Sequence, residues 1–395
     1  MSTSRLLCNC TGLSNRLYFS AAINVGFRKP IRIPINQNFR FLAQNVKHNS
    51  TVAVATQPPV AAKSIGWWLI ACSGTVLTRS GLSMVNWHLF KEFPPLSQIE
   101  WEREFDQYKE FPEFKTRNRY MTLEEFKWIW YMEYLHRMWG RTVGAVFALP
   151  AAYFWYRGYF NKGMKIRSLV FGSLIAFQGL LGWYMVKSGL VETGSEPRVS
   201  QYRLAAHLGS AFLLYTLFLW SALGHLLPPQ MMVAHPNLRR FRMFSHATKG
   251  LIFLTAISGA FVAGLEAGLV YNSFPKMADK WIPDDILEME PKRKNFTENP
   301  TTVQFDHRIL GTSVLLAVSS LWLYSRKVPI SSRARMAINC MMFVALAQVS
   351  LGIATLLLYV PKELAATHQS GSLALLSTAI WLTHELKMVK HLPKV

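Results

Sequence analysis

Two short segments of the chain repeat a histidine that is followed at once by arginine and, four positions after the histidine, by glycine. EYLHRMWGR contains His136, and FDHRILGTS contains His307. Each segment stands at the edge of an apolar run, and two further histidines, His207 and His368, recur in the same order in the two halves of the chain. Histidine is the commonest protein ligand for metals, and paired imidazoles also hold heme iron. The pattern therefore predicts metal or heme chemistry.

The two segments differ three positions before the histidine, where the first has Glu133 and the second has Gln304. Glutamine has nearly the same shape as glutamate but no charge. Residues three apart lie on one face of a helix, so Glu133 and His136 would point the same way. Oxidation of a C–H bond needs a group that takes protons or offsets positive charge, whereas electron storage does not. The difference predicts that the substrate is oxidised in the first half of the chain and that electrons are stored in the second half. The alternative is that Glu133 only pairs with Arg137 or Arg141.

The repeated histidines are predicted to lie at one depth of a membrane. The next cation toward the opposite end of the apolar run follows after 21, 19 and 19 residues, in the pairs His136–Arg157, His307–Arg326 and His368–Lys387. At about 1.5 Å per residue, each gap spans roughly 30 Å, one hydrocarbon thickness. Ionisable groups within a bilayer are costly and mark functional sites. Histidines that face each other in a four-helix bundle are suited to hold heme iron.

Small and basic residues near the histidines also fit a porphyrin. Four glycines lie within four residues of a histidine and would leave room for a flat ring: Gly140, Gly209, Gly311 and Gly371. Arg137 and Arg308 follow their histidines at the polar boundary, where a guanidinium can pair with a heme propionate. The alternative is that the glycines allow close helix packing and the arginines extend to the lipid headgroups.

Composition favours a membrane protein. The chain of 395 residues is 51% hydrophobic and 13% aromatic, yet has a formal net charge of +21, a combination that is unusual for a soluble enzyme. Segments of about 20 apolar residues indicate transmembrane helices. We expect eight, with approximate limits 64–80, 134–156, 168–189, 202–223, 244–265, 306–325, 335–358 and 364–384. The sequence thus predicts an all-α, multi-pass membrane protein.

The N-terminal residues 1–63 are predicted to be a mitochondrial presequence, because they contain no Asp or Glu and eight Lys or Arg residues. A basic tail that binds anionic lipid is the alternative. The loops after the second, fourth and sixth spans are basic and contain no acid, whereas the long loops after the first and fifth are mixed. The positive-inside rule then puts the basic loops and both termini in the matrix, and the histidine sites toward the intermembrane space.

The chain is also a tandem repeat. Gln178 and Gly182 recur as Gln348 and Gly352, between the repeated histidines. Each repeat has four spans, so both cross the membrane in the same direction and are related by a pseudo-twofold axis along the membrane normal. The predicted organisation is two tandem four-helix bundles at 64–225 and 241–390, joined by a matrix linker at 226–240.

The order of these motifs resembles the heme A synthases of the mitochondrial inner membrane. The resemblance covers roughly residues 64–385 and is most specific in EYLHRMWGR and ISGAFVAGLEAGLVYNSFPKM. It implies an oxidoreductase that converts the methyl group at ring position 8 of heme O to a formyl group. The product, heme A, is required by cytochrome c oxidase.

The resemblance also implies roles for single residues. His307 and His368 would hold a resident heme b, His136 and His207 would face the substrate heme O, and the family's glutamate falls on Glu133. If both histidines of the first pair bind iron, dioxygen has no free position. Either one histidine then releases the iron during turnover, or the substrate is oxidised by electron loss and captured by water.

Partners follow from the resemblance and from what the sequence lacks. It shows no motif for a flavin, nicotinamide or iron–sulfur cluster, so electrons would come from a partner, which the family suggests is a ferredoxin. Heme O synthase and a second copy of the chain are further candidate partners, and no nucleic-acid partner is expected. Bacterial relatives often have a cysteine pair in the first long loop, but residues 89–126 contain none. Cys72 and Cys340 lie in separate apolar runs, and we expect no disulfide between them.

Two other functions use similar residues. A diheme b-type protein that carries electrons across the membrane needs hemes near both faces, and four ligands at one depth do not provide them. His225, His235, His246 and His384 lie toward the matrix side but are not repeated. A porphyrin carrier would bind heme without changing it, and Glu133 would then have no evident use.

Overall fold

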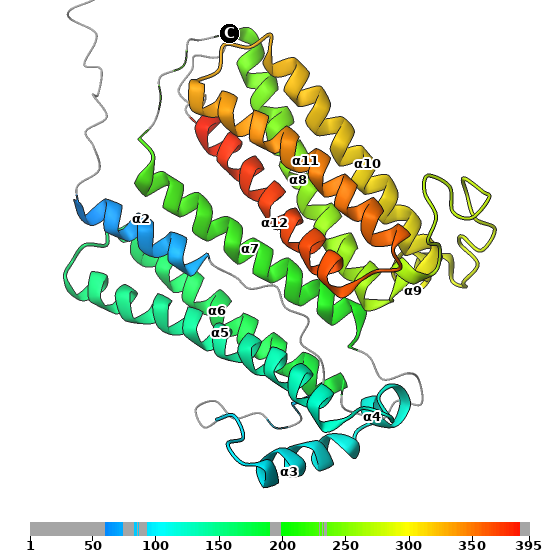
Figure 1. Cartoon of the computed structure of the whole chain (residues 1–395). Coiled ribbons are helices and arrows are strands. Elements are labelled where there is room, and N and C mark those ends of the chain that lie inside the picture. Colours follow the sequence, from blue (N-terminus) through cyan, green and yellow to red (C-terminus); the bar gives the residue numbers. More distant parts are fainter. Residues whose placement is uncertain are drawn as a thin grey trace, which may run out of the picture. The chain divides into compact units, whose positions relative to one another are not determined.

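The computed structural model describes residues 60–73, 83–84, 86, 93–189, 199–228, 230, 232 and 235–387. Residues 1–59, which make up most of the predicted presequence, lie outside them. By its contacts the chain divides into Met1–Val54 and Ala55–Val395, and every described residue belongs to the second unit. The described residues form helices and contain no strand, so the all-α prediction is confirmed (Figure 1). The long helices are α2 (Val60–Cys72), α5 (Leu123–Tyr156), α6 (Lys162–Gly189), α7 (Gln201–Leu226), α8 (Pro236–Gly264), α10 (Pro300–Ser325), α11 (Ser332–Leu357) and α12 (Lys362–Glu385).

Five of these helices, α6, α7, α8, α10 and α11, are long and apolar enough to cross a membrane. Helices α2, α5 and α12 occupy the other three predicted spans but do not meet that criterion. The described part of α2 has only 13 residues. Helix α12 is diluted by Ser, Thr, His and Gln, and the later part of α5 contains Arg141, Pro150 and several Tyr and Trp residues. Five of the eight predicted spans therefore coincide with helices that are long and apolar enough to cross a membrane.

All eight long helices begin earlier than the hydropathy pattern predicts, and three examples show the size of the difference. α5 begins at Leu123 rather than 134, α8 at Pro236 rather than 244, and α10 at Pro300 rather than 306. Polar caps explain the difference. Thr122 and Glu125 form a reciprocal capping box, and the Asn299 side chain accepts the N–H groups of Thr301 and Thr302. Hydropathy marks the apolar part of a helix, whereas capping residues determine where its hydrogen bonds begin.

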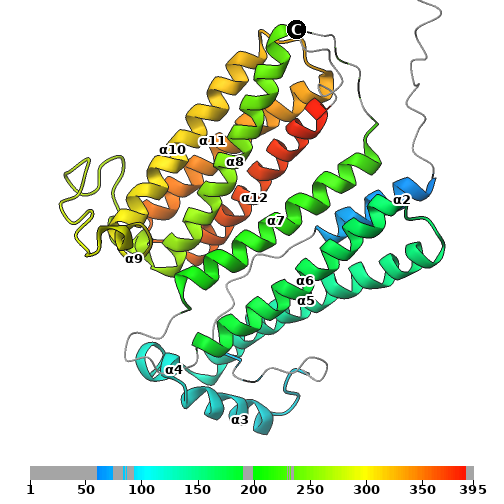
Figure 2. The same cartoon turned by 180° about the vertical axis from the view of Figure 1, so that it is seen from behind.

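The long helices pack in the same cyclic order in both halves of the chain. α2 contacts α5 and α7, and α6 contacts the same two helices. In the second half α8 contacts α10 and α12, and α11 contacts the same two (Figures 1 and 2). Helix α7 also packs against α8 and α12. As a consequence, α6 and α11 each lie between the two histidine-bearing helices of their half.

Close packing holds these helices together. In a bilayer, helix association depends on contact rather than on escape from water, so small residues at the contacts are favourable. Ala256, Ala260, Ala337 and Ala379 are buried in one cluster formed by α7, α8 and α10–α12. At the contact between α7 and α8, a Cβ on Gly264 would lie 2.7 Å from the Cα of Gln201. Only glycine permits this approach of the two backbones.

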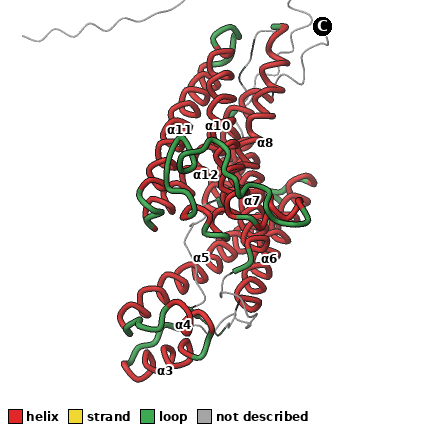
Figure 3. The backbone as a smooth tube through the Cα atoms, turned by 90° about the vertical axis from the view of Figure 1, so that its right-hand side faces the viewer, coloured by secondary structure: helices red, strands yellow, loops and turns green. Residues whose placement is uncertain are grey.

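Two segments outside the predicted spans lie at ends of the long helices, one before the start of α5 (Figure 3) and one between α8 and α10 (Figure 1). The first contains α3 (Gln98–Lys109) and α4 (Pro112–Arg117), whose aromatic side chains pack on the start of α5. Burial raises the pKa of the Tyr108 phenol in this cluster. The second segment connects α8 to α10 and contains η1 (Ala267–Leu269), η2 (Lys292–Lys294) and α9 (Asn295–Glu298). An ion pair of 2.8 Å between Arg117 Nη1 and Glu266 Oε1 joins the two segments.

Candidate functional site

The second histidine pair is brought together by α10 and α12. The ring centroids of His307 and His368 are 6.4 Å apart, and the ring planes are at 89°. Bonds from imidazole nitrogen to a transition metal are about 2 Å long, so two rings on opposite sides of one ion have centroids roughly 6 Å apart. The separation in this structure therefore fits one metal ion held between the two rings.

The first pair is formed by His136 on α5 and His207 on α7, whose rings lie within electrostatic range of each other. Nδ1 of His207 is buried and has no hydrogen-bond partner, and the same is true of Nδ1 of His368. A buried polar atom without a partner is costly and calls for an explanation. A ligand such as a metal ion bound at Nδ1 itself would account for it.

A glutamine on the intervening helix fixes the second histidine of each pair. Nε2 of Gln178 on α6 donates to the backbone oxygen of His207 at 2.8 Å, and Nε2 of Gln348 on α11 donates to the backbone oxygen of His368 at 2.7 Å. These bonds tie α6 to α7 and α11 to α12 at the level of the rings. The sequence shows the glutamines as part of the repeat, but this role is visible only in the structure.

Glycines four residues later make room for the same rings. A Cβ on Gly182 would lie 3.3 Å from Cε1 of His207, and one on Gly352 would lie 2.8 Å from Cε1 of His368. A larger residue would push either imidazole out of place. The repeated Gln-x-x-x-Gly motif is thus a device that positions a histidine on the next helix.

His307 is held by α8. Its Nδ1 lies 2.7 Å from Oγ of Ser258, and a Cβ on the neighbouring Gly259 would lie 3.2 Å from its Cε1. A hydrogen bond at one ring nitrogen orients the ring and leaves the other nitrogen for a metal. A Ser-Gly dipeptide also stands at 73–74, ahead of the first pair. Gly74 lies outside the described residues.

Glu133 is buried in a polar cage at the start of the first site. Its carboxylate accepts the backbone N–H groups of Ser83 and Met84 at 2.9 and 3.1 Å and the Ser83 hydroxyl at 2.7 Å. Nη2 of Arg137 donates to the other oxygen at 2.8 Å, and the two side chains are only 1% and 8% exposed. The ion pair expected under the alternative interpretation is therefore present, but it is buried rather than at a solvated surface.

The second half repeats this cage without the charge. Nη2 of Arg308 and Nε2 of Gln304 donate to the backbone oxygen of Tyr271 at 2.9 and 3.0 Å, just as Arg137 donates to that of Met84 at 2.7 Å. Both arginines thus anchor the segment that precedes their helix. The Nε of Arg308 is buried without a partner, so a donor remains there for a further group.

The anchored segment of the second half carries a carboxylate of its own. Burial opposes its charge, but hydrogen bonds from Thr301 and Tyr271 outweigh that effect and hold the pKa of Asp285 below its usual range. The Tyr271 hydroxyl donates to it at 2.9 Å. This carboxylate stabilises the segment whose backbone Arg308 binds.

The four glycines that were predicted to leave room for a ring have two kinds of surroundings. No atom lies within 4 Å of a Cβ built on Gly140 or Gly311, so open space adjoins each helix one turn after its histidine. In contrast, a Cβ on Gly209 would lie 3.6 Å from Ile257, and one on Gly371 would collide with Gln348. Neither of these two glycines borders open space, and the approach of Gln348 leaves no room for a side chain at Gly371.

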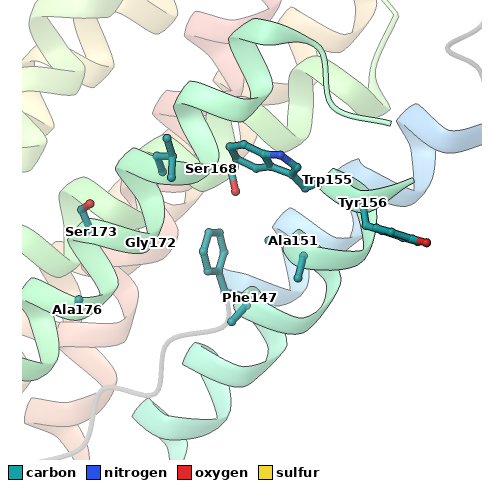
Figure 4. A pocket seen from close by; sticks show the side chains of 11 residues that line it. Phe147, Ala151, Trp155, Tyr156, Ser168, Gly172, Ser173 and Ala176 are labelled. Atoms are coloured by element: carbon teal, nitrogen blue, oxygen red, sulfur yellow. The ribbon is translucent and has the colours of Figure 1, made fainter. Parts of the chain in front are cut away.

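An apolar groove of about 710 Å³ lies between α5 and α6. Phe147 and Trp155 of α5 face Ser168 and Gly172 of α6 across it (Figure 4). No histidine lines the groove, and it begins several turns beyond His136. It is an open surface on the apolar flank of these helices and is separate from both histidine pairs.

These observations fit heme better than a bare metal ion. Among the described residues, no group of three or more His, Cys, Asp or Glu side chains could hold a metal ion. A porphyrin supplies four ligands itself and needs only axial ones from the protein. The spacing of His307 and His368, the orphaned ring nitrogens and the open space beside Gly311 all meet this need. Cys72 and Cys340 are both free thiols, as predicted.

Comparison with known proteins gives one consistent result. Residues 68–380 match a family model described as cytochrome oxidase assembly protein (COX15-CtaA). The human protein named heme A synthase COX15 is 57% identical over 351 residues, which are 85% of this chain and 86% of that protein. The Arabidopsis thaliana protein of the same name is 44% identical over 87% of this chain and 80% of its own length. A bacterial heme A synthase from Nitrosospira multiformis is 43% identical over 84% of this chain and 95% of its own length.

Proposed function

Because the chain belongs to the family of cytochrome oxidase assembly proteins, we propose that it is a heme A synthase, an oxidoreductase that converts heme O to heme A. One structural observation carries the proposal beyond the family name. Two histidine pairs are held by the same Gln-x-x-x-Gly device, but only the first has a buried carboxylate one turn away, on the same helix as its first histidine. Such an asymmetry suits one site for chemistry and one for electron storage.

His307 and His368 are the proposed ligands of a resident heme b. When bound, this heme stores electrons and passes them on. Ser258 orients His307, while Gln348 and Gly352 position His368. The unpartnered Nε of Arg308 is the proposed donor to a propionate of this heme.

His136 and His207 are the proposed ligands of the substrate heme O. Glu133 is the proposed catalytic residue, and its carboxylate takes up a proton or stabilises positive charge that develops on the substrate. Arg137 and the backbone N–H groups of Ser83 and Met84 fix the carboxylate in one orientation. Arg137 is also the proposed contact for a substrate propionate. A carboxylate held in this way needs little reorganisation during the reaction.

The proposed architecture is eight transmembrane helices in two four-helix bundles, related by a pseudo-twofold axis along the membrane normal. The units are residues 64–225 and 241–390, preceded by a presequence at 1–63 and joined by a linker at 226–240. The identical cyclic order of helix contacts in the two halves supports this arrangement. We place the protein in the mitochondrial inner membrane, with both termini in the matrix and the heme sites toward the intermembrane space.

The proposed partners follow from the chemistry. If dioxygen oxidises the methyl group to a formyl group, reduction of its second oxygen atom to water consumes electrons, and the chain has no flavin or nicotinamide motif to supply them. A ferredoxin is the proposed electron donor, and heme O synthase is the proposed source of the substrate. A homo-oligomer is a further proposal.

The function is tested in cells that lack their own heme A synthase. After expression of the full chain, hemes are extracted and separated by chromatography. We expect heme A to appear and heme O to fall. If heme O is bound and accumulates unchanged, the protein is a porphyrin carrier and not an oxidoreductase.

The orientation predicts where a protease can cut. In mitoplasts, which expose the intermembrane-space side, trypsin is expected to cleave the segment 276–298, whose Lys292 and Arg293 are exposed. The segment 326–335 should be spared until the membrane is opened. Mass spectrometry of the released fragments shows which of the two segments was cleaved. The reverse pattern would put the histidine sites on the matrix side.

The positioning role of Gly182 predicts a selective loss. Gly182→Val should displace the His207 ring and lower heme A formation about a hundredfold, since a shift of about 1 Å at a reactive site has an effect of that size. The resident heme b should stay bound. Gly179→Val is the matched control, because it makes the same change on the same helix where no atom lies within 4 Å. Equal loss in both variants would mean that helix propensity, not the ring contact, is responsible.

A further inference from the structure

A polar cavity lies at the other end of the helices from the histidine pairs. It has a volume of about 230 Å³, several times the roughly 30 Å³ that one water molecule takes up. It lies where the start of α6, the end of α7 and the end of α12 meet, and His225 is 18 residues beyond His207 on α7 (225 − 207). At about 1.5 Å per residue, the cavity is roughly 27 Å from the level of the rings. It is lined by Arg167, Trp220, Ser221, Gly224, His225 and Lys387.

The lining is basic and contains no carboxylate. The nearby Glu385 does not line the cavity; its side chain is 1% exposed and is bound by Arg333 at 3.0 Å. Arg167 and Lys387 come from different helices and carry like charges into one small space. Like charges that converge without an acid between them favour an anion.

The cationic groups are held in place. Nε of Arg167 donates to the backbone oxygen of Gly163 at 3.2 Å, and its Nη1 donates to Oγ of Ser221 at 3.3 Å. Nζ of Lys387 is 2.7 Å from Nε2 of His384, to which an ammonium group can only donate. Nζ of Lys387 lies 4.0 Å from the position that a Cβ on Gly224 would take, so the ammonium group is next to the end of α7. Each cation thus keeps further N–H donors for a ligand.

We propose that this cavity binds a phosphate group. A guanidinium, an ammonium and a hydroxyl are the donors that commonly hold phosphate oxygens. The cavity lies at the polar end of membrane helices, where basic pockets between helices bind the headgroups of anionic phospholipids. A phospholipid headgroup and free phosphate share this chemistry. The inference is independent of the heme function proposed above.

The test compares the full chain with two variants. Arg167→Gln/Lys387→Gln removes two cations from the cavity, and Lys162→Gln/Lys327→Gln removes two exposed cations that do not line it. Each protein is placed in nanodiscs of equal parts phosphatidylcholine and phosphatidylglycerol, and the lipids that stay bound on release are identified by native mass spectrometry. The parent chain and the control variant should retain phosphatidylglycerol, and the cavity variant should bind it about thirtyfold more weakly.

A second arm identifies the source of the phosphate. Inorganic phosphate is added to each protein in neutral detergent, and the melting temperature is recorded. If phosphate raises the melting temperature of the parent chain but not that of the cavity variant, and the parent chain retains no phosphatidylglycerol, the site is assigned to free phosphate. If the cavity variant fails to fold, Gly224→Leu serves instead, because it fills the cavity and leaves both cations. Binding of both probes by the cavity variants as tightly as by the parent chain, or equal loss in the control, overturns the proposal.

Discussion

Replacement of His307 or His368 by alanine is expected to remove most of the resident heme b from the purified protein. The ring centroids of the two histidines lie 6.4 Å apart, and Ser258, Gln348 and Gly352 hold the rings in place. The two histidines therefore form a pair before any ligand binds. Removal of either ring leaves one axial ligand and an empty space in its place. Heme content is measured by pyridine hemochrome spectra against protein concentration.

His136→Ala is the matched control for this experiment. It removes the corresponding histidine of the first half, so it should abolish conversion of heme O while most heme b stays bound. Ser258→Ala should keep heme b but shift its reduction potential, since it removes the hydrogen bond to Nδ1 of His307. Full heme b in both His307→Ala and His368→Ala would refute the assignment of the storage site.

Glu133→Gln is expected to preserve the fold and the resident heme but to lower heme A formation by at least about a hundredfold, the usual contribution of a general acid or base. The variant copies what the second half already has at Gln304, where the amide and Arg308 share the backbone oxygen of Tyr271. An amide still forms hydrogen bonds, but it neither takes up a proton nor offsets positive charge. Since oxidation to an aldehyde passes through an alcohol, heme O should accumulate with some hydroxymethyl heme.

Removal of one partner of a buried ion pair usually costs about 3–5 kcal/mol, so stability needs its own control. In the variant, Arg137 retains its bonds to the backbone oxygens of Met84 and Asn86 at 2.7 Å each. Gln304→Glu is the reciprocal variant, and it should leave turnover in the first half largely intact. Near-normal heme A from Glu133→Gln would show that the carboxylate serves only as an ion-pair partner of Arg137.

Much of this site could be predicted from the sequence because the chain repeats itself. One histidine in an apolar run is ambiguous, but His136, His207, His307 and His368 recur in the same order in both halves of the chain. The same repeat exposed the exchange of Glu133 for Gln304. The helical class followed from the length and apolar character of the runs, and the structure confirms that class for the described residues.

The remainder depends on contacts between helices that no single segment reveals. Gln178 and Gly182 stand on α6, and their target, His207, is on α7. Their spacing is visible in the sequence, but their partner is not. Gly371 was wrongly expected to border open space, since the side chain that fills it, Gln348, comes from α11. Early helix starts were missed because capping by Thr122 and Asn299 involves polar residues, which hydropathy excludes.

The most direct test of the central claim is turnover by the purified protein. The full chain is placed in nanodiscs with its resident heme, supplied with heme O and reduced ferredoxin in air, and sampled over time for chromatography of the extracted hemes. We predict that heme O declines while hydroxymethyl heme rises and falls and heme A accumulates, and that Glu133→Gln stops this sequence. Heme O recovered unchanged from protein that is fully loaded with heme b would contradict the account.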